Sequence, residues 1–116
     1  MKVHWTDNAV DHLDGIYAYI SRTSELYARR VIDRLTRRSE QIGTFPGSGR
    51  SVSELEMPQI REVIEGPYRI IYFIKPDQID VLAVIHCAQQ SPWHGIAQQE
   101  AAQDGESADA TSPPVS

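Results

Sequence analysis

The sequence predicts an α+β domain in which an N-terminal strand and an α-helical hairpin pack on an antiparallel sheet of three to four further strands. The first observation concerns residues 61–86. They contain three short runs rich in β-branched and aromatic residues, separated by breaks at Gly66-Pro67 and Pro76-Asp77. Residues 8–42 carry the second, because their apolar residues recur at helical spacing. The third is the alternation of Val3 and Trp5 with polar residues at the start of the chain.

The N-terminal half is expected to form one strand and two helices. Residues 2–6 form the strand, laid against the later hairpins, and a helix over about 8–21 follows with Asp7 or Asn8 as its N-terminal cap. Ser24 is expected to cap a second helix that ends near Gly43. The apolar stripes of the two helices are Ala9, Leu13, Ile16, Tyr17 and Ile20, and Ala28, Val31, Ile32, Leu35 and Ile42. The four-residue connection predicts an antiparallel helical hairpin.

A loop and two strand hairpins are expected to complete the domain. Residues 45–50 cannot continue the helix, because Pro46 lacks an amide hydrogen and the two following glycines permit positive φ in a turn. Residues 51–58 are expected to be irregular, and the three apolar runs then form consecutive antiparallel strands joined by tight turns.

Length and composition indicate one domain with an acidic tail. A chain of 116 residues supplies one modest core, and we place the domain at residues 1–96. Residues 97–116 are rich in Ala, Gln, Asp, Glu, Ser and Pro, so we expect a disordered tail. Of the net charge of −5, this tail contributes −4 through its acidic residues Glu100, Asp104, Glu106 and Asp109.

The same composition predicts a cytoplasmic protein without membrane association. No apolar run approaches the roughly 18 residues that span a bilayer. Residues 1–9 lack the layout of a signal peptide. Cys87 is the single cysteine, so no intramolecular disulfide can form and a reducing compartment fits.

Four charged or titratable side chains of the predicted sheet form the main candidate site. An arginine trio can hold a phosphate and stabilise charge growing on it, while a histidine exchanges a proton near neutral pH. The four residues are Arg50, Arg61, Arg69 and His86.

A structural interpretation of the same residues stays open at this stage. Arg61 can pair with Glu62 or Glu65, Arg69 can pair across its hairpin, and His86 can simply end a strand. Whether Arg61 and Arg69 share a face of the sheet depends on the length of the turn at Gly66.

A second basic cluster lies on the second helix, and it is composed of Arg29, Arg30, Arg34, Arg37 and Arg38. A nucleic-acid patch is one interpretation, but Tyr27 is the only aromatic residue beside it, so we favour a solvated helix face. The four histidines and Cys87 lack the spacing of a metal site, and no nucleotide-binding motif is present. We therefore expect no metal, no cofactor and no sequence-specific DNA binding by the chain alone.

In order and spacing, several of these segments together resemble a RelE/ParE-superfamily toxin over roughly residues 1–90. They are Trp5, the helical hairpin, Phe45-Pro46-Gly47-Ser48-Gly49-Arg50, Arg61-Glu62, Tyr68-Arg69-Ile70-Ile71-Tyr72 and Val84-Ile85-His86. The resemblance implies a small bacterial toxin of a type II toxin–antitoxin module, with a cognate antitoxin as its partner. It also implies a strand, two helices and an antiparallel sheet.

The two branches of this superfamily imply different targets. The nuclease branch cuts messenger RNA on the ribosome, whereas the ParE branch acts on DNA gyrase and blocks replication. Arg69 matches the arginine of the nuclease branch's Tyr-Arg-x-x-Tyr strand. However, Ile60 and Glu62 stand where some nucleases carry lysines, and Gln89 and Gln90 stand where they carry a basic residue. Because those cations stabilise the transition-state charge, the resemblance favours a ParE-like gyrase inhibitor that is not an enzyme.

Two alternatives remain. In a RelE-like, ribosome-dependent mRNA endoribonuclease, the catalytic residues would be Arg50, Arg61, Arg69 and His86. A non-toxic homologue that binds its antitoxin and regulates their shared promoter is the other alternative. It is motivated by the neutral residues after His86, where ParE-like chains often carry arginine.

Overall fold

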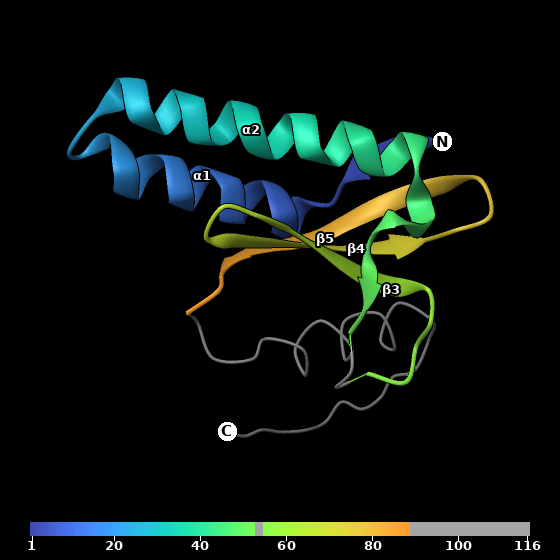
Figure 1. Cartoon of the computed structure of the whole chain (residues 1–116). Coiled ribbons are helices and arrows are strands. Elements are labelled where there is room, and N and C mark those ends of the chain that lie inside the picture. Colours follow the sequence, from blue (N-terminus) through green and yellow to red (C-terminus); the bar gives the residue numbers. More distant parts are fainter. Residues whose placement is uncertain (53–54, 89–116) are drawn as a thin grey trace.

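Two helices cover one face of a five-stranded sheet in the computed structural model, which describes residues 1–52 and 55–88 (Figure 1). The elements are β1 (Lys2–Trp5), α1 (Asp7–Ser21), α2 (Glu25–Thr44), a 3₁₀ turn η1 (Pro46–Ser48), β2 (Arg50–Ser51), β3 (Ile60–Glu65), β4 (Tyr68–Ile74) and β5 (Gln78–His86). The predicted α+β class, the first strand and the helical hairpin are confirmed. The predicted tail from residue 97, and its boundary at residue 96, lie outside the described residues.

The sheet is mixed, with the strand order β1-β5-β4-β3-β2. Four further strands follow the helices and pair antiparallel with one another, as predicted, whereas β1 pairs parallel to β5. The prediction that residues 51–58 are irregular was wrong at one end, because Arg50 and Ser51 pair with Glu62 and Arg61 as β2. A two-residue strand carries no periodicity of its own, so only its pairing with β3 defines it.

The N-terminal cap of α1 differs from the prediction. Thr6, and not Asp7 or Asn8, is the cap: its Oγ1 accepts from the Ala9 N–H at 3.2 Å. The Thr6 hydroxyl also donates to the Val81 carbonyl at 2.8 Å, so one side chain fixes both the helix and its contact with β5. Asp7 lies in the first turn, where its charge favours the helix dipole. Ser24 caps α2 as predicted, accepting from the Tyr27 N–H at 3.1 Å.

Apolar side chains fill both faces of the sheet. The face under the helices contains the main core: Ala9, Val31, Leu35, Ile42, Val63, Ile70, Tyr72, Ile79, Val81 and Val84. The opposite face, called the open face below, carries a second buried cluster: Val52, Ile60, Ile71, Leu82, Ala83 and Ile85. The same strands also carry polar and charged residues, and these form the candidate site.

A β-bulge joins α1 to the middle of β5. Ile71 pairs with Ala83 and Tyr72 with Val81, so Leu82 is the extra residue. The Leu82 carbonyl accepts from the Asn8 side-chain amide at 2.9 Å. The bulge therefore aims a backbone acceptor at the start of α1, which holds the helical hairpin over β5.

Neither helix among the described residues has the combined length and apolar character needed to cross a lipid bilayer.

His12 makes the stability of this helix–strand contact pH-dependent. Its Nδ1 accepts from the Val84 N–H at 3.2 Å, which requires that nitrogen to be unprotonated. Burial lowers the pKa of His12 below its usual value, and the nearby Asp11 opposes this shift. The unfolded chain therefore binds the proton more readily. We expect the free energy of unfolding to fall as pH drops through the unfolded pKa of about 6.5, until pH lies below the lowered folded value.

A His12→Asn variant tests this expectation, because the Asn side-chain oxygen can replace Nδ1 as the acceptor without titrating in this range. Urea unfolding between pH 7.5 and 5.5 should show a smaller loss of stability for the variant than for the wild type. His4→Asn serves as the control, because it makes the same substitution at an exposed histidine outside this contact. Equal slopes for the wild type and His12→Asn would contradict the expectation.

Candidate functional site

Gly49 anchors the loop that precedes β2 to the sheet. Its N–H donates to the Tyr72 hydroxyl at 3.0 Å, and its carbonyl accepts from Arg61 Nη1 at 2.8 Å. The Tyr72 hydroxyl in turn donates to the Pro46 carbonyl at 2.8 Å. Hydrogen bonds to Tyr72 and Arg61 thus hold the loop against the sheet, and they fix the position of the next residue, Arg50.

Gly49 is required for its small size and not for positive φ, contrary to the expectation for this loop. Its φ is −79°, whereas Gly66, in the β3–β4 turn, has a φ of 59°. A Cβ at Gly49 would overlap the Tyr72 hydroxyl and lie 2.8 Å from the Glu62 carbonyl oxygen. The close approach of the loop to β3 and β4 therefore depends on glycine.

The Tyr72 phenol remains a hydrogen-bond donor at neutral pH. Its side chain is fully buried, and burial raises its pKa. The Gly49 N–H and the positive charges of Arg61 and Arg38 oppose this shift. Because the ordinary tyrosine pKa is already about 10, a further rise keeps the proton that is donated to Pro46.

On the open face, a buried carboxylate organises two of the predicted site residues. Glu62 is 6% exposed, and its Oε2 accepts from Arg50 Nε at 2.7 Å. Arg69 Nη1 lies 3.7 Å from the other oxygen, Oε1, so Arg69 contributes mainly Coulomb attraction there. Arg50 is 67% exposed and Arg69 28%. One carboxylate thus holds two arginines of differing exposure on the open face of the sheet.

The other two predicted residues lie on the helix side of the sheet. Arg61 pairs in register with Tyr72, a member of the core under the helices. His86 pairs in register with Tyr68, and their rings meet edge to face with centroids 5.5 Å apart. Directly paired residues of antiparallel strands share one face, so both side chains follow their partners to the helix side.

The sheet therefore divides the four candidate residues into two pairs. Arg50 and Arg69 meet around Glu62 on the open face, while Arg61 and His86 lie on the helix face, at Gly49 and Tyr68 respectively. The question of whether Arg61 and Arg69 share a face is settled by the register, in which Arg69 pairs with Ile64 and Arg61 with Tyr72. The arginine trio does not converge on one point.

The comparisons with known proteins agree with this architecture. Residues 3–91 match the family model described as the ParE toxin of the type II toxin–antitoxin system parDE. The chain belongs to the ParE toxin family. It is 34% identical over 96 residues to a protein of Sinorhizobium fredii named "Putative toxin Y4kP", covering 78% of this chain and 93% of that one.

Two solved structures share the fold of this ParE-family chain. The chromosomal ParDE system of P. aeruginosa gives a TM-score of 0.61 at 23% identity, covering 74% of this chain and 95% of that one. The toxin–antitoxin complex RelBE2 of Mycobacterium tuberculosis gives 0.57 at 18% identity, covering 76% and 92%. At these identities the two matches show a common fold.

The basic cluster of this ParE-family chain is partly balanced by its own carboxylates. Arg29 contacts Glu25 at 3.1 Å, and Arg37 contacts Asp33 at 3.0 Å, each one helical turn away. Arg38 lies 3.9 Å from a carboxylate oxygen of Glu65, across the gap between α2 and β3, and its Nη1 also donates to the Gln41 side chain. These ion pairs are typical of a solvated helix face.

Two residues that organise the site were not singled out from the sequence. Glu62 was considered as a possible neighbour of Arg61, but it pairs with Arg50 and Arg69. Tyr72 was noted only within a family motif. The sequence did contain an indication of the role of Glu62. Ile60, Glu62 and Ile64 are two residues apart in β3, so Glu62 shares a face with two isoleucines, and a charge buried on such a face needs a partner.

Replacement of Glu62 is expected to remove the ion pairs that it forms with Arg50 and Arg69 on the open face. Glu62→Gln keeps the size of the side chain but removes the charge that Arg50 and Arg69 share. Because Arg50 can reach solvent, we expect a loss of only about 1 kcal/mol in the free energy of unfolding. Glu65→Gln is the matched control: its ion pair is long and partly exposed, and its loss should stay below about 0.5 kcal/mol. Urea denaturation measures both, and equal losses would contradict the proposed role of Glu62.

Proposed function

We propose that this chain is the toxin of a type II module that inhibits DNA gyrase and is neutralised by a cognate antitoxin. The observation that carries the proposal is the match of residues 3–91 to the ParE family. The separation of the four candidate residues onto two faces of the sheet supports an inhibitor over a nuclease. Nuclease catalysis requires cations and a proton-transfer group within reach of one phosphate.

An antitoxin partner is part of the same proposal. The two structural neighbours are a ParDE system and a RelBE2 toxin–antitoxin complex. By analogy with them, we expect the partner of this chain to be encoded in the adjacent reading frame. Coexpression of the two proteins should yield a stable complex and restore the growth of cells that produce the toxin.

Gyrase supercoiling tests the target directly. Purified protein added to gyrase, ATP and relaxed plasmid should reduce the supercoiled product in a dose-dependent manner, and the antitoxin should reverse this inhibition. Undiminished supercoiling at large molar excess would contradict gyrase as the target. New 5′ ends in primer extension on translated mRNA would instead favour the endoribonuclease, and antitoxin binding with neither effect would favour the non-toxic homologue.

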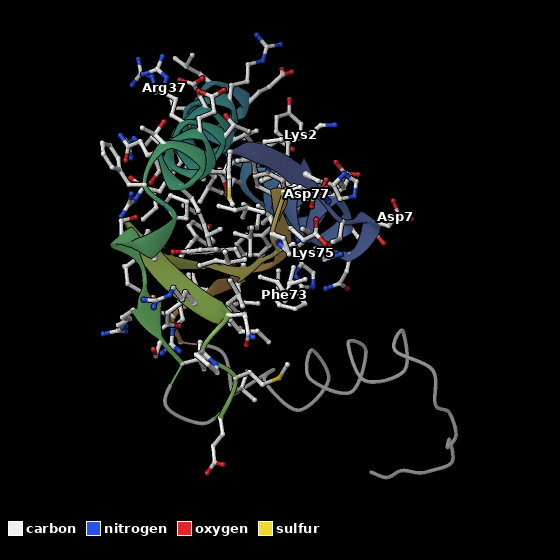
Figure 2. All side chains as sticks on the ribbon, turned by 90° about the vertical axis from the view of Figure 1, so that its right-hand side faces the viewer. Lys2, Asp7, Arg37, Phe73, Lys75 and Asp77 are labelled. Carbon is white, nitrogen blue, oxygen red and sulfur yellow. The ribbon has the colours of Figure 1, made fainter. Side chains whose placement is uncertain are left out.

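Arg69 and Arg50 are the residues that we expect to act at the target, because both lie on the open face. Arg69→Ala and Arg50→Ala should each weaken gyrase inhibition at least several-fold while preserving the circular dichroism spectrum and antitoxin binding. Arg37→Ala is the matched control, since Arg37 lies at the outer surface of α2, away from the sheet (Figure 2). A loss of the folded spectrum in Arg69→Ala would assign that residue a structural role instead.

A further inference from the structure

The helix α2 carries more positive charge than its own carboxylates balance. It contains five arginines but only three acidic residues. Local ion pairs or the contact with β3 engage Arg29, Arg37 and Arg38. Arg30 and Arg34 are exposed and have no acidic partner within residues 1–52 and 55–88. These two side chains hold the excess charge.

Arg30 and Arg34 lie one turn apart, an arrangement in which like charges repel. Two large apolar side chains lie beside them on the same helix surface: Leu26, 61% exposed, and Tyr27, 50% exposed. We call Leu26, Tyr27, Arg30 and Arg34 the arginine stripe. Arginine and tyrosine are enriched at protein–protein interfaces. The uncompensated positive charge of the stripe favours binding of an acidic ligand.

Among the residues that the structure describes, no other helix or strand carries a comparable excess of positive charge. Helix α1 carries three aspartates and no lysine or arginine. The stretch 50–69 carries three arginines against four glutamates. An acidic segment that contacts this domain would therefore be repelled by α1 and attracted to α2.

This chain supplies such a segment itself. Residues 100–109 contain Glu100, Asp104, Glu106 and Asp109, and no basic residue lies between 100 and 116. The length of the connection allows contact, because the 12 residues from Ala88 to Glu100 can span up to about 40 Å, whereas the 20 residues of α2 extend for about 30 Å.

The described part of the chain also ends on a side of the molecule from which the acidic segment can reach α2. The end of β5 lies on the same side as the turn between α1 and α2 (Figure 1). His86, at that end, packs against the Tyr68 ring. Burial raises the pKa of Tyr68, and electrostatic interaction with Tyr27, in the first turn of α2, adds to this shift. The described chain therefore ends on the side of the molecule where α2, and with it the arginine stripe, begins.

We propose that the acidic segment 100–109 docks on the arginine stripe of α2 in the same molecule, with its carboxylates paired to Arg30 and Arg34. Exposed ion pairs are individually weak, but the covalent tether provides a high effective concentration of carboxylates at the helix. An acidic partner of α2 must then displace this segment before it binds. This intramolecular contact is independent of whether gyrase is the target.

NMR on the full chain tests the contact. A neutral-segment variant combines Glu100→Gln, Asp104→Asn, Glu106→Gln and Asp109→Asn. Outside the substituted segment and its immediate neighbours, the largest amide shift differences from the wild type should fall on residues 26–38. These differences should disappear in 0.5 M NaCl, where the screening length is only about 4 Å. An added peptide of residues 97–116 should bind the neutral-segment variant several-fold more tightly than it binds the wild type, because the wild-type segment competes.

Two charge-matched variants establish which arginines are responsible. Arg30→Gln with Arg34→Gln should abolish both the α2 shifts and the binding of the peptide. Arg29→Gln with Arg37→Gln removes the same charge from arginines that already have local partners, and it should retain both. Equal effects of the two variants would overturn the proposal. So would shifts centred on Arg50 and Arg69, shifts that depend on protein concentration, or no shifts at all.

Discussion

A Gly49→Ala variant is expected to lose about 3 kcal/mol of stability, since overpacking and broken buried hydrogen bonds each cost about 1–3 kcal/mol. The new Cβ would overlap the Tyr72 hydroxyl and lie 2.8 Å from the Glu62 carbonyl. The Tyr72 side chain is fully buried, so it cannot move aside freely. The loop must therefore retreat, breaking the hydrogen bonds that Gly49 makes with Tyr72 and Arg61.

Gly47→Ala is the matched control for this prediction. It lies two residues earlier in the same loop, and a Cβ there would meet nothing within 4 Å. Urea denaturation should show a large loss for Gly49→Ala and a change within about 0.5 kcal/mol for Gly47→Ala, as for other exposed substitutions. Similar values for the two variants would show that the loop tolerates displacement from the sheet.

The second large effect is expected for Ile70→Ala, in the centre of β4. Ile70 is fully buried in the core under the helices. Truncation leaves a cavity among close-packed side chains, which should cost about 3 kcal/mol. For a domain of this size, such a loss lowers the melting temperature by roughly 15 °C.

Ile64→Ala provides the comparison, because Ile64 is the same residue type in the neighbouring strand but is 42% exposed. Its truncation removes less buried apolar surface and should cost less than about 1 kcal/mol. Thermal unfolding followed by circular dichroism measures both variants. A small shift for Ile70→Ala would mean that the helical hairpin settles into the cavity and refills it.

The strands of the hairpins were predicted to within a residue or two. Their apolar runs are long enough for β-branched and aromatic residues to define them, and Gly66-Pro67 interrupts the pattern where the first turn lies. The cap of α1 was misassigned, because Thr6, Asp7 and Asn8 are all good capping residues. Contact with the Val81 carbonyl on β5 distinguishes Thr6 from the other two, and that contact spans 75 positions of the sequence.

In the candidate site too, the sequence identified the residues but not their tertiary contacts. Arg50, Arg61, Arg69 and His86 were named because all four come from the predicted sheet or its adjoining loop and could together hold a phosphate and transfer a proton. The structure provides a contact for each of them. Their grouping could not be derived. In a strand, side chains alternate between faces, so a shift of one residue in the register between β3 and β4 would exchange every partner.

Local periodicity, turn residues and the order of motifs were sufficient to specify the helices, the strands and the resemblance to the superfamily, because each depends on residues close together in the chain. The parallel pairing of β1 with β5, the buried Glu62 between two arginines and the hydrogen bonds of Gly49 depend on the tertiary structure. Each of these joins segments distant in sequence, and their geometry is determined by strand register and core packing, which no local pattern encodes.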